Sequence, residues 1–380
     1  LYQAAAVTPI YLQRAALHCA LGDDLHHAAQ ALQRGQAPQG EPFVLHEVQE
    51  PRTYLYAAKT GESLSERLDR LLAETLGVPP QTLDDCLLIV ASTSLDISEL
   101  EALTTERQGF RPDDSTSLDL LAHQLRQRWG FAAAFTLNTA CTSAANGLLY
   151  GARLINAGQY ARTLVLSFET PSAIAMQGFG ALMLTSASGQ YRPFHPERDG
   201  LLLGEAYAAA LLSREPGDAP LARLLGGFSA CDTSSLTTTR EDGSHIHWVM
   251  QQALNSAGCS AAQINLVKLH GTATSANDEA ESNGMRRLYG EQMPALSLLK
   301  PWLGHTLGAC GLSESLLLLK TLQLGALPAV DYASEALLPF SAEPQALAAD
   351  SMLLTNFFGF GGNNASLVLQ GCAQGDSACR

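Results

Sequence analysis

The chain has 380 residues, of which 46% are hydrophobic and 16% are charged. This length exceeds what one simple core supports, so we expect two domains or two closely packed halves. The formal net charge of −14 argues against binding to nucleic acid or to an anionic membrane, because both require a basic surface.

Neither the cysteines nor the N-terminal segment indicates secretion. The eight cysteines have no CxxC pair and no regular spacing, which argues against a disulfide scaffold and against a zinc site. The N-terminal segment lacks the basic and then apolar layout of a signal peptide, and no window of about 18 residues is apolar throughout. We therefore expect a cytoplasmic protein with no membrane span and no bound metal.

Short β-rich runs alternate with helices of small residues along the chain, which is typical of an α/β fold. Most of the strand-like runs are apolar throughout instead of alternating, so we expect both faces of the sheet to be covered. In chain order these runs lie at residues 84–92, 163–168, 206–213, 264–270 and 365–370.

The layout contains a weak internal repeat. A strand that ends at Cys141 leads into a helix of small residues that runs to about residue 156. Later, residues 296–299 lead through KPWLGH into a helix at residues 311–323. A duplication explains this pattern, with the seam near residues 214–229.

The segment NTACTSAANG places Cys141 at the turn between a strand and a helix, with Thr142 or Ser143 available as the helix cap. At this position the helix dipole and unpaired backbone N–H groups favour the thiolate. The small neighbours leave room around the sulfur, or they let a buried helix pack closely. The segment alone is therefore compatible with a nucleophile and with a buried structural cysteine.

Two histidines lie in glycine-containing segments later in the chain. His270 ends an apolar strand and opens HGTATSAND, where Asp278 and Glu281 are expected to order the loop, and His305 lies in KPWLGHTLGACG. A histidine at the carboxyl end of a buried strand faces a crevice. Together with Cys141 the histidines could bind a metal, but zinc prefers further ligands at short spacing. A nucleophile assembled from distant segments fits better.

Four motifs in this order, TACTS, HGTATSAND, KxxxGHTLGA and FGFGGNN, resemble those of the β-ketoacyl-acyl-carrier-protein synthases, condensing enzymes of the thiolase superfamily. The resemblance implies the thiolase fold, a duplicated five-layer α-β-α-β-α sandwich. Its N-terminal half would span residues 8–220 and carry the cysteine, and its C-terminal half would span residues 221–372 and carry both histidines. A dimer, of identical chains or with a related subunit, is also implied.

The same resemblance assigns a reaction to this chain, that of an acyltransferase in fatty acid or polyketide elongation. Cys141 would take an acyl group from a carrier-protein thioester. His270 and His305 would face the malonyl thioester as N–H donors that stabilise the enolate formed as CO2 leaves. That enolate would attack the acyl-Cys141 thioester to give a β-ketoacyl product.

Further residues match supporting positions of the family. Lys300 and Glu314 match the lysine and glutamate that brace the site, with a purely structural ion pair as the alternative. The backbone N–H groups of Cys141 and Phe360 match the oxyanion hole, and Phe360 also matches a gate between the acyl pocket and the malonyl side. Four more positions match groups that bind substrate or bring main chain close to the sulfur: Thr272, Thr274, Gly359 and Gly361.

The substrates implied by the resemblance arrive on the phosphopantetheine of an acyl carrier protein, and no further cofactor is implied. On a chain of negative charge, an acidic carrier protein needs a local basic site. Two arginine pairs offer one, with solvated helix faces as the alternative: Arg126 with Arg128, and Arg286 with Arg287. His245 and His247 are expected in an extended surface segment or loop, with a metal pair as the alternative.

The chain departs from the family pattern at positions where bulky changes would reshape the entrance or the acyl pocket: Pro301, Trp302, Phe357 and Cys310. Residues 41–130 also form a shorter stretch than in the housekeeping enzymes, which suggests a specialised branch such as the aryl-polyene or other type II polyketide synthases. A thiolase would need a second cysteine in FGFGGNN, which has none. A chain-length-factor-like partner subunit with little activity of its own is a further alternative, against which the retained Cys141 argues.

Overall fold

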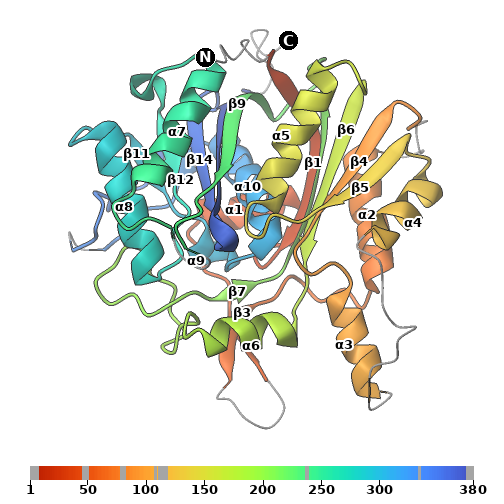
Figure 1. Ribbon diagram of the computed structural model, residues 1–380, viewed down its shortest axis with the longest axis horizontal. Coiled ribbons are helices and arrows are strands. Elements are labelled where there is room, and N and C mark those ends of the chain that lie inside the picture. Colours follow the sequence, from red (N-terminus) through yellow and green to blue (C-terminus); the bar gives the residue numbers. More distant parts are fainter. Residues whose placement is uncertain are drawn as a thin grey trace.

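The computed structural model describes residues 8–44, 51–77, 83–106, 109, 119–235, 239–332 and 335–373 of the chain. A sheet of ten strands runs through the molecule (Figure 1). Its strands are β1 (Ile10–Cys19), β4 (Cys86–Ala91), β5 (Ala133–Leu137), β6 (Arg162–Glu169), β8 (Ala206–Ser213), β9 (Ala222–Cys231), β10 (Leu266–Lys268), β11 (Ala295–Ser297), β14 (Met352–Phe358) and β15 (Asn363–Gly371).

The two ends of this sheet repeat one pattern of strand directions. From one outer edge inward, β5, β4 and β6 are parallel, and antiparallel β8 and β1 follow. From the other edge, β11, β10 and β14 are parallel, and antiparallel β15 and β9 follow. β1 and β9 pair with each other in the middle. The topology therefore contains the duplication that the internal repeat predicts.

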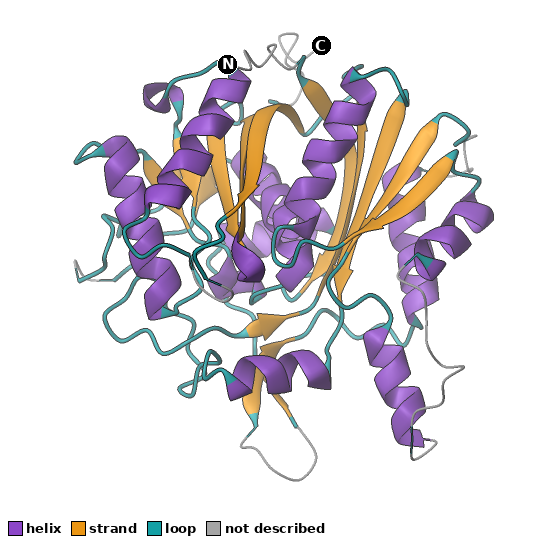
Figure 2. Ribbon diagram, in the orientation of Figure 1, coloured by secondary structure: helices purple, strands orange, loops and turns teal. Residues whose placement is uncertain are grey.

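Helices cover both faces of each half, which gives five layers (Figures 1 and 2). Between the two halves lie α1 (Leu25–Gln33), α5 (Ser143–Asn156) and α10 (Cys310–Leu324). Outside the C-terminal half lie α7 (Ser244–Ala257) and α8 (Ser275–Tyr289), and outside the N-terminal half lie α2 (Leu64–Leu76) and α4 (Leu120–Trp129). Strands covered in this way are buried on both faces, as β4 and β8 are along their whole length.

The remaining elements are short. The helices are α3 (Ile97–Glu106), α6 (Ala173–Ala181) and α9 (Lys300–Leu303). A three-stranded sheet contains β2 (Glu41–Phe43), β3 (Arg52–Leu55) and β7 (Leu203–Gly204), and a two-stranded sheet contains β12 (Ala326–Leu327) and β13 (Gln345–Ala346). In Figure 1, α3, α6, β3 and β7 lie at the lower end of the molecule.

Small residues let the two central helices approach closely. A Cβ atom on Gly311 of α10 would lie 2.3 Å from the backbone nitrogen of Ala145 in α5. A Cβ atom on Gly147 would lie 2.9 Å from Val165 in β6. Both distances are too short for a side chain, so the run of small residues after Cys141 is needed for packing.

Every predicted strand is present, but the predicted seam is misplaced in part. Residues 222–229 of the expected seam belong to β9, a strand in the interior of the sheet. Their apolar and glycine-rich sequence resembles a linker, whereas they pair with β15 along most of its length. The boundary expected between residues 220 and 221 stays a prediction. β1 and β9 come from opposite sides of it and are hydrogen-bonded to each other, so the sheet is continuous across the boundary.

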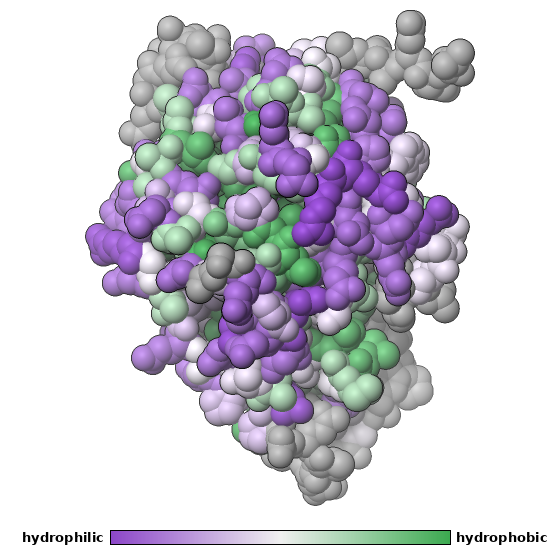
Figure 3. All heavy atoms as spheres, turned by 90° about the vertical axis from the view of Figure 1, so that its left-hand side faces the viewer, coloured by the Kyte–Doolittle hydropathy of each residue, from purple (hydrophilic) through white to green (hydrophobic). Residues whose placement is uncertain are grey.

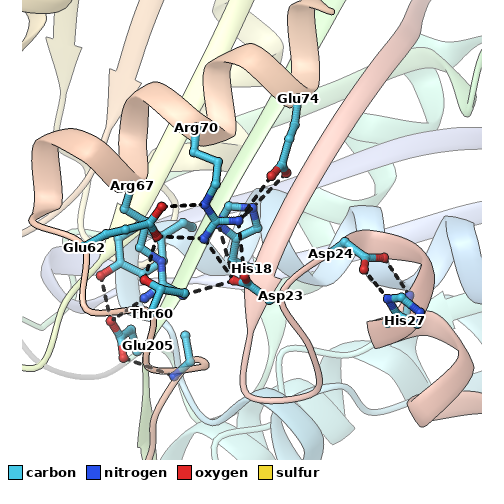
Figure 4. Close-up of polar contacts among 12 residues, drawn as sticks. His18, Asp23, Asp24, His27, Thr60, Glu62, Arg67, Arg70, Glu74 and Glu205 are labelled. Atoms are coloured by element: carbon cyan, nitrogen blue, oxygen red, sulfur yellow. Dashed lines mark hydrogen bonds and ion pairs between the residues drawn. The ribbon is translucent and has the colours of Figure 1, made fainter.

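A network of charged residues attaches α2 to the chain segment after β1 (Figure 4). Ser63 caps α2, and Glu66 completes the capping box. Arg70 on this helix donates to Glu62 at 2.8 Å and lies 3.2 Å from both Glu74 and Asp23. These contacts hold the outer helix against the N-terminal half of the sheet.

The cysteines mostly belong to the core. Cys19, Cys86, Cys141 and Cys310 are buried free thiols, and Cys372 is disulfide-bonded. Within the part of the chain that the structure describes, none of the helices has both the length and the apolar composition that crossing a membrane requires.

Candidate active site

Cys141 lies in a tight turn between β5 and α5. Ala140 has a positive φ of 53°, a strained backbone conformation that brings the cysteine to the start of the helix. Thr142 occupies the cap position of α5, and its hydroxyl donates to the Asn363 side chain at 2.7 Å. Only 5% of Cys141 is exposed, so the thiol lies inside the protein.

The environment of the thiol differs from the sequence-based expectation. Burial raises the pKa of Cys141 to about 11, although the Lys300 ammonium and the backbone N–H groups of Phe360 and Cys141 act in the opposite direction. The N–H groups at the helix start do favour the thiolate, as expected, but the pKa rises overall because desolvation of the buried thiolate outweighs them.

His270 follows β10 and is held by buried carboxylates. Glu281 of α8 accepts the backbone N–H groups of His270 and Gly271, at 2.8 and 2.9 Å. Asp278 accepts the backbone N–H of Thr272 at 3.0 Å. Both carboxylates are fully buried, and burial raises the pKa of Glu281 to about 7 and that of Asp278 to about 6.

The two imidazoles contact each other nearly at a right angle, with 5.4 Å between ring centroids. Lys300 Nζ lies 3.2 Å from Nδ1 of His270, and the backbone N–H of Leu307 donates to Nδ1 of His305 at 3.2 Å. Because both partners donate, Nδ1 accepts in each ring and Nε2 carries the proton. Burial, followed by the charge of Lys300, holds the pKa of both histidines well below 6.5. Both rings are therefore neutral N–H donors.

A buried charge network lies behind His270. Lys300 Nζ donates to the carbonyl oxygen of His270 at 2.7 Å and to Glu314 Oε1 at 2.8 Å. Lys268 donates to the other oxygen of Glu314 at 2.6 Å. Lys268 was not among the predicted site residues, although its single charge in the apolar strand sequence INLVKLH was a usable signal.

Two cavities meet at Cys141. One has a volume of about 350 Å³ and is lined by residues that include His270, His305, Thr272, Thr274 and Phe358. The other has a volume of about 630 Å³ and is lined by residues that include Thr93, Leu95, Ile97, Ser172 and Leu307. Cys141, Phe179 and Phe360 line both cavities, so the sulfur lies where they join.

The loop that begins at Gly359 supplies the wall between the cavities. A Cβ atom on Gly359 would lie 3.2 Å from the backbone nitrogen of Cys141, and Gly361 has a φ of 79°. Phe360 stacks on Phe179 of α6, with 5.4 Å between ring centroids. The loop thus brings the main chain to the sulfur and places one aromatic ring at the junction, whereas Gly361 lies outside the residues that line either cavity.

Four unusual residues line neither of the two cavities: Pro301, Trp302, Phe357 and Cys310. Cys310 is buried and its thiol donates to the carbonyl oxygen of Cys141 at 3.0 Å. Phe357 is buried beneath the Lys268 ammonium. Phe357 and Cys310 pack in the interior, whereas Pro301 and Trp302 are half-buried, so the expected effect of the four on the entrance or the pocket stays a prediction.

Glu169 is a second residue of the site that was not predicted. It ends β6, and its buried carboxylate accepts the hydroxyls of Thr93 and Ser94 and the backbone N–H of Gly308, at 2.7, 2.5 and 3.2 Å. Burial raises its pKa. The carboxylate ties two loops beside Cys141 together. A polar residue at the carboxyl end of an apolar strand was its signal.

The other polar candidates form local contacts. His245 and His247 lie on helix α7 instead of an extended segment, and Nδ1 of His245 is 2.9 Å from the Asn364 side chain. No group of three or more metal-binding side chains occurs among the described residues. Arg128 pairs with Asp69, and Arg287 pairs with Asp242 at 3.1 Å.

Two family models match this chain. The N-terminal domain of β-ketoacyl synthases matches residues 71–217, and their C-terminal domain matches residues 221–331. The chain belongs to the β-ketoacyl synthase family. This ketosynthase is accordingly an acyltransferase, and its five-layer architecture is the thiolase fold, so the expected family and fold are both confirmed.

Individual relatives support the assignment. The 3-oxoacyl-[acyl-carrier-protein] synthase 2 of Vibrio cholerae serotype O1 is 30% identical over 276 residues, which cover 67% of this chain and 67% of the relative. A ketosynthase from Xenorhabdus doucetiae, solved in complex with its chain length factor, is 28% identical with a TM-score of 0.81, covering 96% of this chain and 98% of its own. A β-ketoacyl synthase from Burkholderia phymatum STM815, 23% identical with a TM-score of 0.81 over 96% of this chain and 100% of its own, shares the fold.

Proposed function

We propose that this ketosynthase catalyses a two-step decarboxylative Claisen condensation. In the first step the Cys141 sulfur attacks an acyl thioester on a carrier protein. The acyl bond to the carrier sulfur breaks, an acyl-Cys141 thioester forms, and the thiol proton ends on the departing carrier thiol. The Lys300 ammonium and the N–H of Phe360 offset part of the penalty for charging the buried sulfur.

In the second step a malonyl thioester occupies the cavity on the histidine side. The Nε2–H groups of His270 and His305 donate to its thioester carbonyl oxygen, the bond to the carboxylate breaks, and CO2 leaves. The resulting enolate carbon attacks the carbonyl of acyl-Cys141. The carbon–sulfur bond then breaks, Cys141 leaves as thiolate, and a β-ketoacyl thioester remains on the carrier.

The observation that carries this proposal is the meeting of sulfur and two neutral imidazoles in one cavity. Both rings have Nδ1 occupied by a donor, so both present Nε2–H as the free donor. The larger cavity on the other side of Phe360 provides space for the acyl chain, with Phe360 as gate. Backbone N–H groups of Cys141 and Phe360 would serve as the oxyanion hole during each acyl transfer.

We further propose an acyl carrier protein as the substrate carrier, with its phosphopantetheine passing Thr272 and Thr274 of the smaller cavity. The enzyme then needs no cofactor of its own. Figure 3 views the side of the molecule that carries α8, where hydrophilic residues surround a hydrophobic patch.

A dimer, of identical chains or with a chain-length-factor-like subunit, is proposed by analogy with the relative from Xenorhabdus doucetiae.

A specialised acyl substrate is a finer proposal. The acyl cavity combines apolar residues with the hydroxyl-bearing Thr93, Ser94 and Ser172 and with Asp96. Hydroxyl groups in the wall can donate weak hydrogen bonds to π systems, which unsaturated or aromatic chains have and saturated chains lack. Equal acylation of Cys141 by long saturated and by polyunsaturated or aromatic carrier thioesters would contradict the specialised branch.

The central test is detection of the acyl intermediate. Wild-type protein incubated with a set of acyl-carrier-protein thioesters should gain the mass of one acyl group, and Cys141→Ala should gain none. Condensation with malonyl carrier protein should then release CO2. A wild-type protein that takes no acyl group from any carrier thioester would contradict the enzymatic proposal and favour a silent partner subunit.

A further inference from the structure

The site contains a second buried lysine for which the proposed reaction has no use so far. Lys268 lies in β10, two residues before His270, and is 0% exposed. Neither cavity is lined by it. A lysine buried in an apolar strand is costly unless its charge is matched by acceptors, so this position requires an explanation.

Three acceptors surround the Lys268 ammonium. Nζ donates to Glu314 Oε2 at 2.6 Å and to the carbonyl oxygen of Asn356 at 2.7 Å, and it lies 3.7 Å from the ring centroid of Phe357. A carboxylate, a carbonyl and an aromatic face together match the three N–H donors of an ammonium group. The unusual phenylalanine at position 357 is therefore part of the lysine's binding environment.

Glu314 is shared by two ammonium groups. Lys268 contacts Oε2 and Lys300 contacts Oε1, at 2.6 and 2.8 Å. One carboxylate facing two ammonium groups leaves a net positive charge beside the histidines. The titratable groups around it are Lys300, Glu314, Cys310, Cys141, His270, His305 and, behind His270, Glu281 and Asp278.

We propose that Lys268 is a positioning residue that fixes Glu314 and Lys300 and keeps His270 and His305 as neutral Nε2–H donors. Glu314 held from both sides cannot turn away from Lys300, and Lys300 in turn donates to Nδ1 and to the carbonyl oxygen of His270. The charge of Lys268 adds to that of Lys300 in disfavouring protonation of both rings. The catalytic part of this inference rests on the proposed function.

A structural ion pair alone predicts a different outcome. Loss of such a pair lowers the melting temperature and leaves histidine titration unchanged. Loss of a residue whose charge keeps the two histidines neutral raises the pH midpoint of histidine titration. The decisive variant is Lys268→Gln, which keeps N–H donors for Glu314 and Asn356 but removes the charge.

The experiment follows the titration of 13C-labelled histidines by NMR in wild type, Lys268→Gln, Lys268→Arg and the control Lys320→Gln, whose lysine lies on α10 away from the cavities. In Lys268→Gln the midpoints of His270 and His305 should rise by about one pH unit. Lys268→Arg and Lys320→Gln should titrate like wild type. Unchanged midpoints in folded Lys268→Gln overturn the inference.

Two further measurements distinguish failure of this inference from failure of the proposed function. The pH at which malonyl decarboxylation begins to fall should be about one unit higher in Lys268→Gln than in wild type, because the midpoints of both histidines move by that amount. If Lys268→Gln does not fold, Lys268→Arg decides, because shifted midpoints in this charge-retaining variant contradict the inference. A wild type without acylation or decarboxylation contradicts the proposed function, while the NMR titration still tests Lys268.

Discussion

His270 and His305 have different positions in the chain and the same chemical state. Each accepts a hydrogen bond at Nδ1, from Lys300 and from the Leu307 backbone respectively, which fixes the proton on Nε2. Buried neutral rings do not gain charge near pH 6, because burial removes hydration that a charged ring needs and Lys300 repels a second positive charge. The two donors should therefore act together over a wide pH range.

This state leads to a prediction for the decarboxylation step. His305→Ala should lower malonyl decarboxylation by about 100-fold, because one of two donors to the enolate oxygen is lost. Acylation of Cys141 should continue in this variant. The wild-type decarboxylation rate should remain nearly constant from pH 8 to pH 6, since the pKa of both histidines lies well below 6.5. Radiolabelled CO2 release and intact mass measure the two steps, and parallel loss of both would contradict separate roles.

Residue identity was predictable at this scale, but residue environment was not. Ordered motifs pointed to Cys141, His270 and His305 because the residue types themselves carry the chemistry. The net rise in the pKa of the thiol was not predicted, because full burial depends on helices and strands distant in the chain. Lys268 and Glu169 were missed for a similar reason, since their partners come from other elements.

At the scale of elements, helix α8 holds the loop that contains His270. Glu281 and Asp278 reach back from the helix to the backbone N–H groups of residues 270–272. Their carboxylates are buried, so the ionised forms lose hydration that the hydrogen bonds only partly replace. The position of the loop at residues 270–272 is therefore linked to the protonation of these two carboxylates.

The linkage predicts a pH-dependent contribution to stability. The pKa of Glu281 is about 7 in the folded chain, above its ordinary value near 4.5, so the folded state retains a proton that the unfolded state has released. Its stabilising contribution is complete below about pH 4.5 and is lost as pH rises toward 7. Glu281→Gln should therefore show a flatter dependence of melting temperature on pH between 5 and 7 than wild type. Glu291→Gln, an exposed control, should follow wild type, and an equally steep curve for Glu281→Gln would contradict the linkage.

The contact between the central helices leads to a second prediction at this scale. Gly311→Ala should lower the free energy of unfolding by about 2 kcal/mol or more, because the added methyl group meets the backbone of Ala145. Gly178→Ala in α6 is the matched control, since an added Cβ there meets no atom within 4 Å and alanine favours a helix. Chemical denaturation of both variants measures the difference, and equal stabilities would show that α5 and α10 separate easily.

At the scale of the whole molecule, the duplicated sheet places the chemistry at the meeting of two halves. Cys141 follows β5 of the first half, and His270 follows β10 of the second. Apolar runs predicted the strands because burial on both faces leaves a direct pattern in the sequence. The register between β1 and β9 left no such pattern, and residues 222–229 were placed at the seam of the duplication although they form a central strand.

The outer edge of the sheet carries the last prediction, which concerns assembly. β5 lies at one end of the ten strands, has partly exposed side chains along its length, and contains neither charge nor proline. Such an edge favours pairing with a strand of another chain. Wild type should therefore be a dimer by light scattering, and Phe135→Lys should shift it toward monomer by placing a charge in the paired edge. Gln159→Lys adds the same charge in an exposed turn and should remain dimeric. A monomeric wild type, alone and with a related subunit, would contradict assembly through β5.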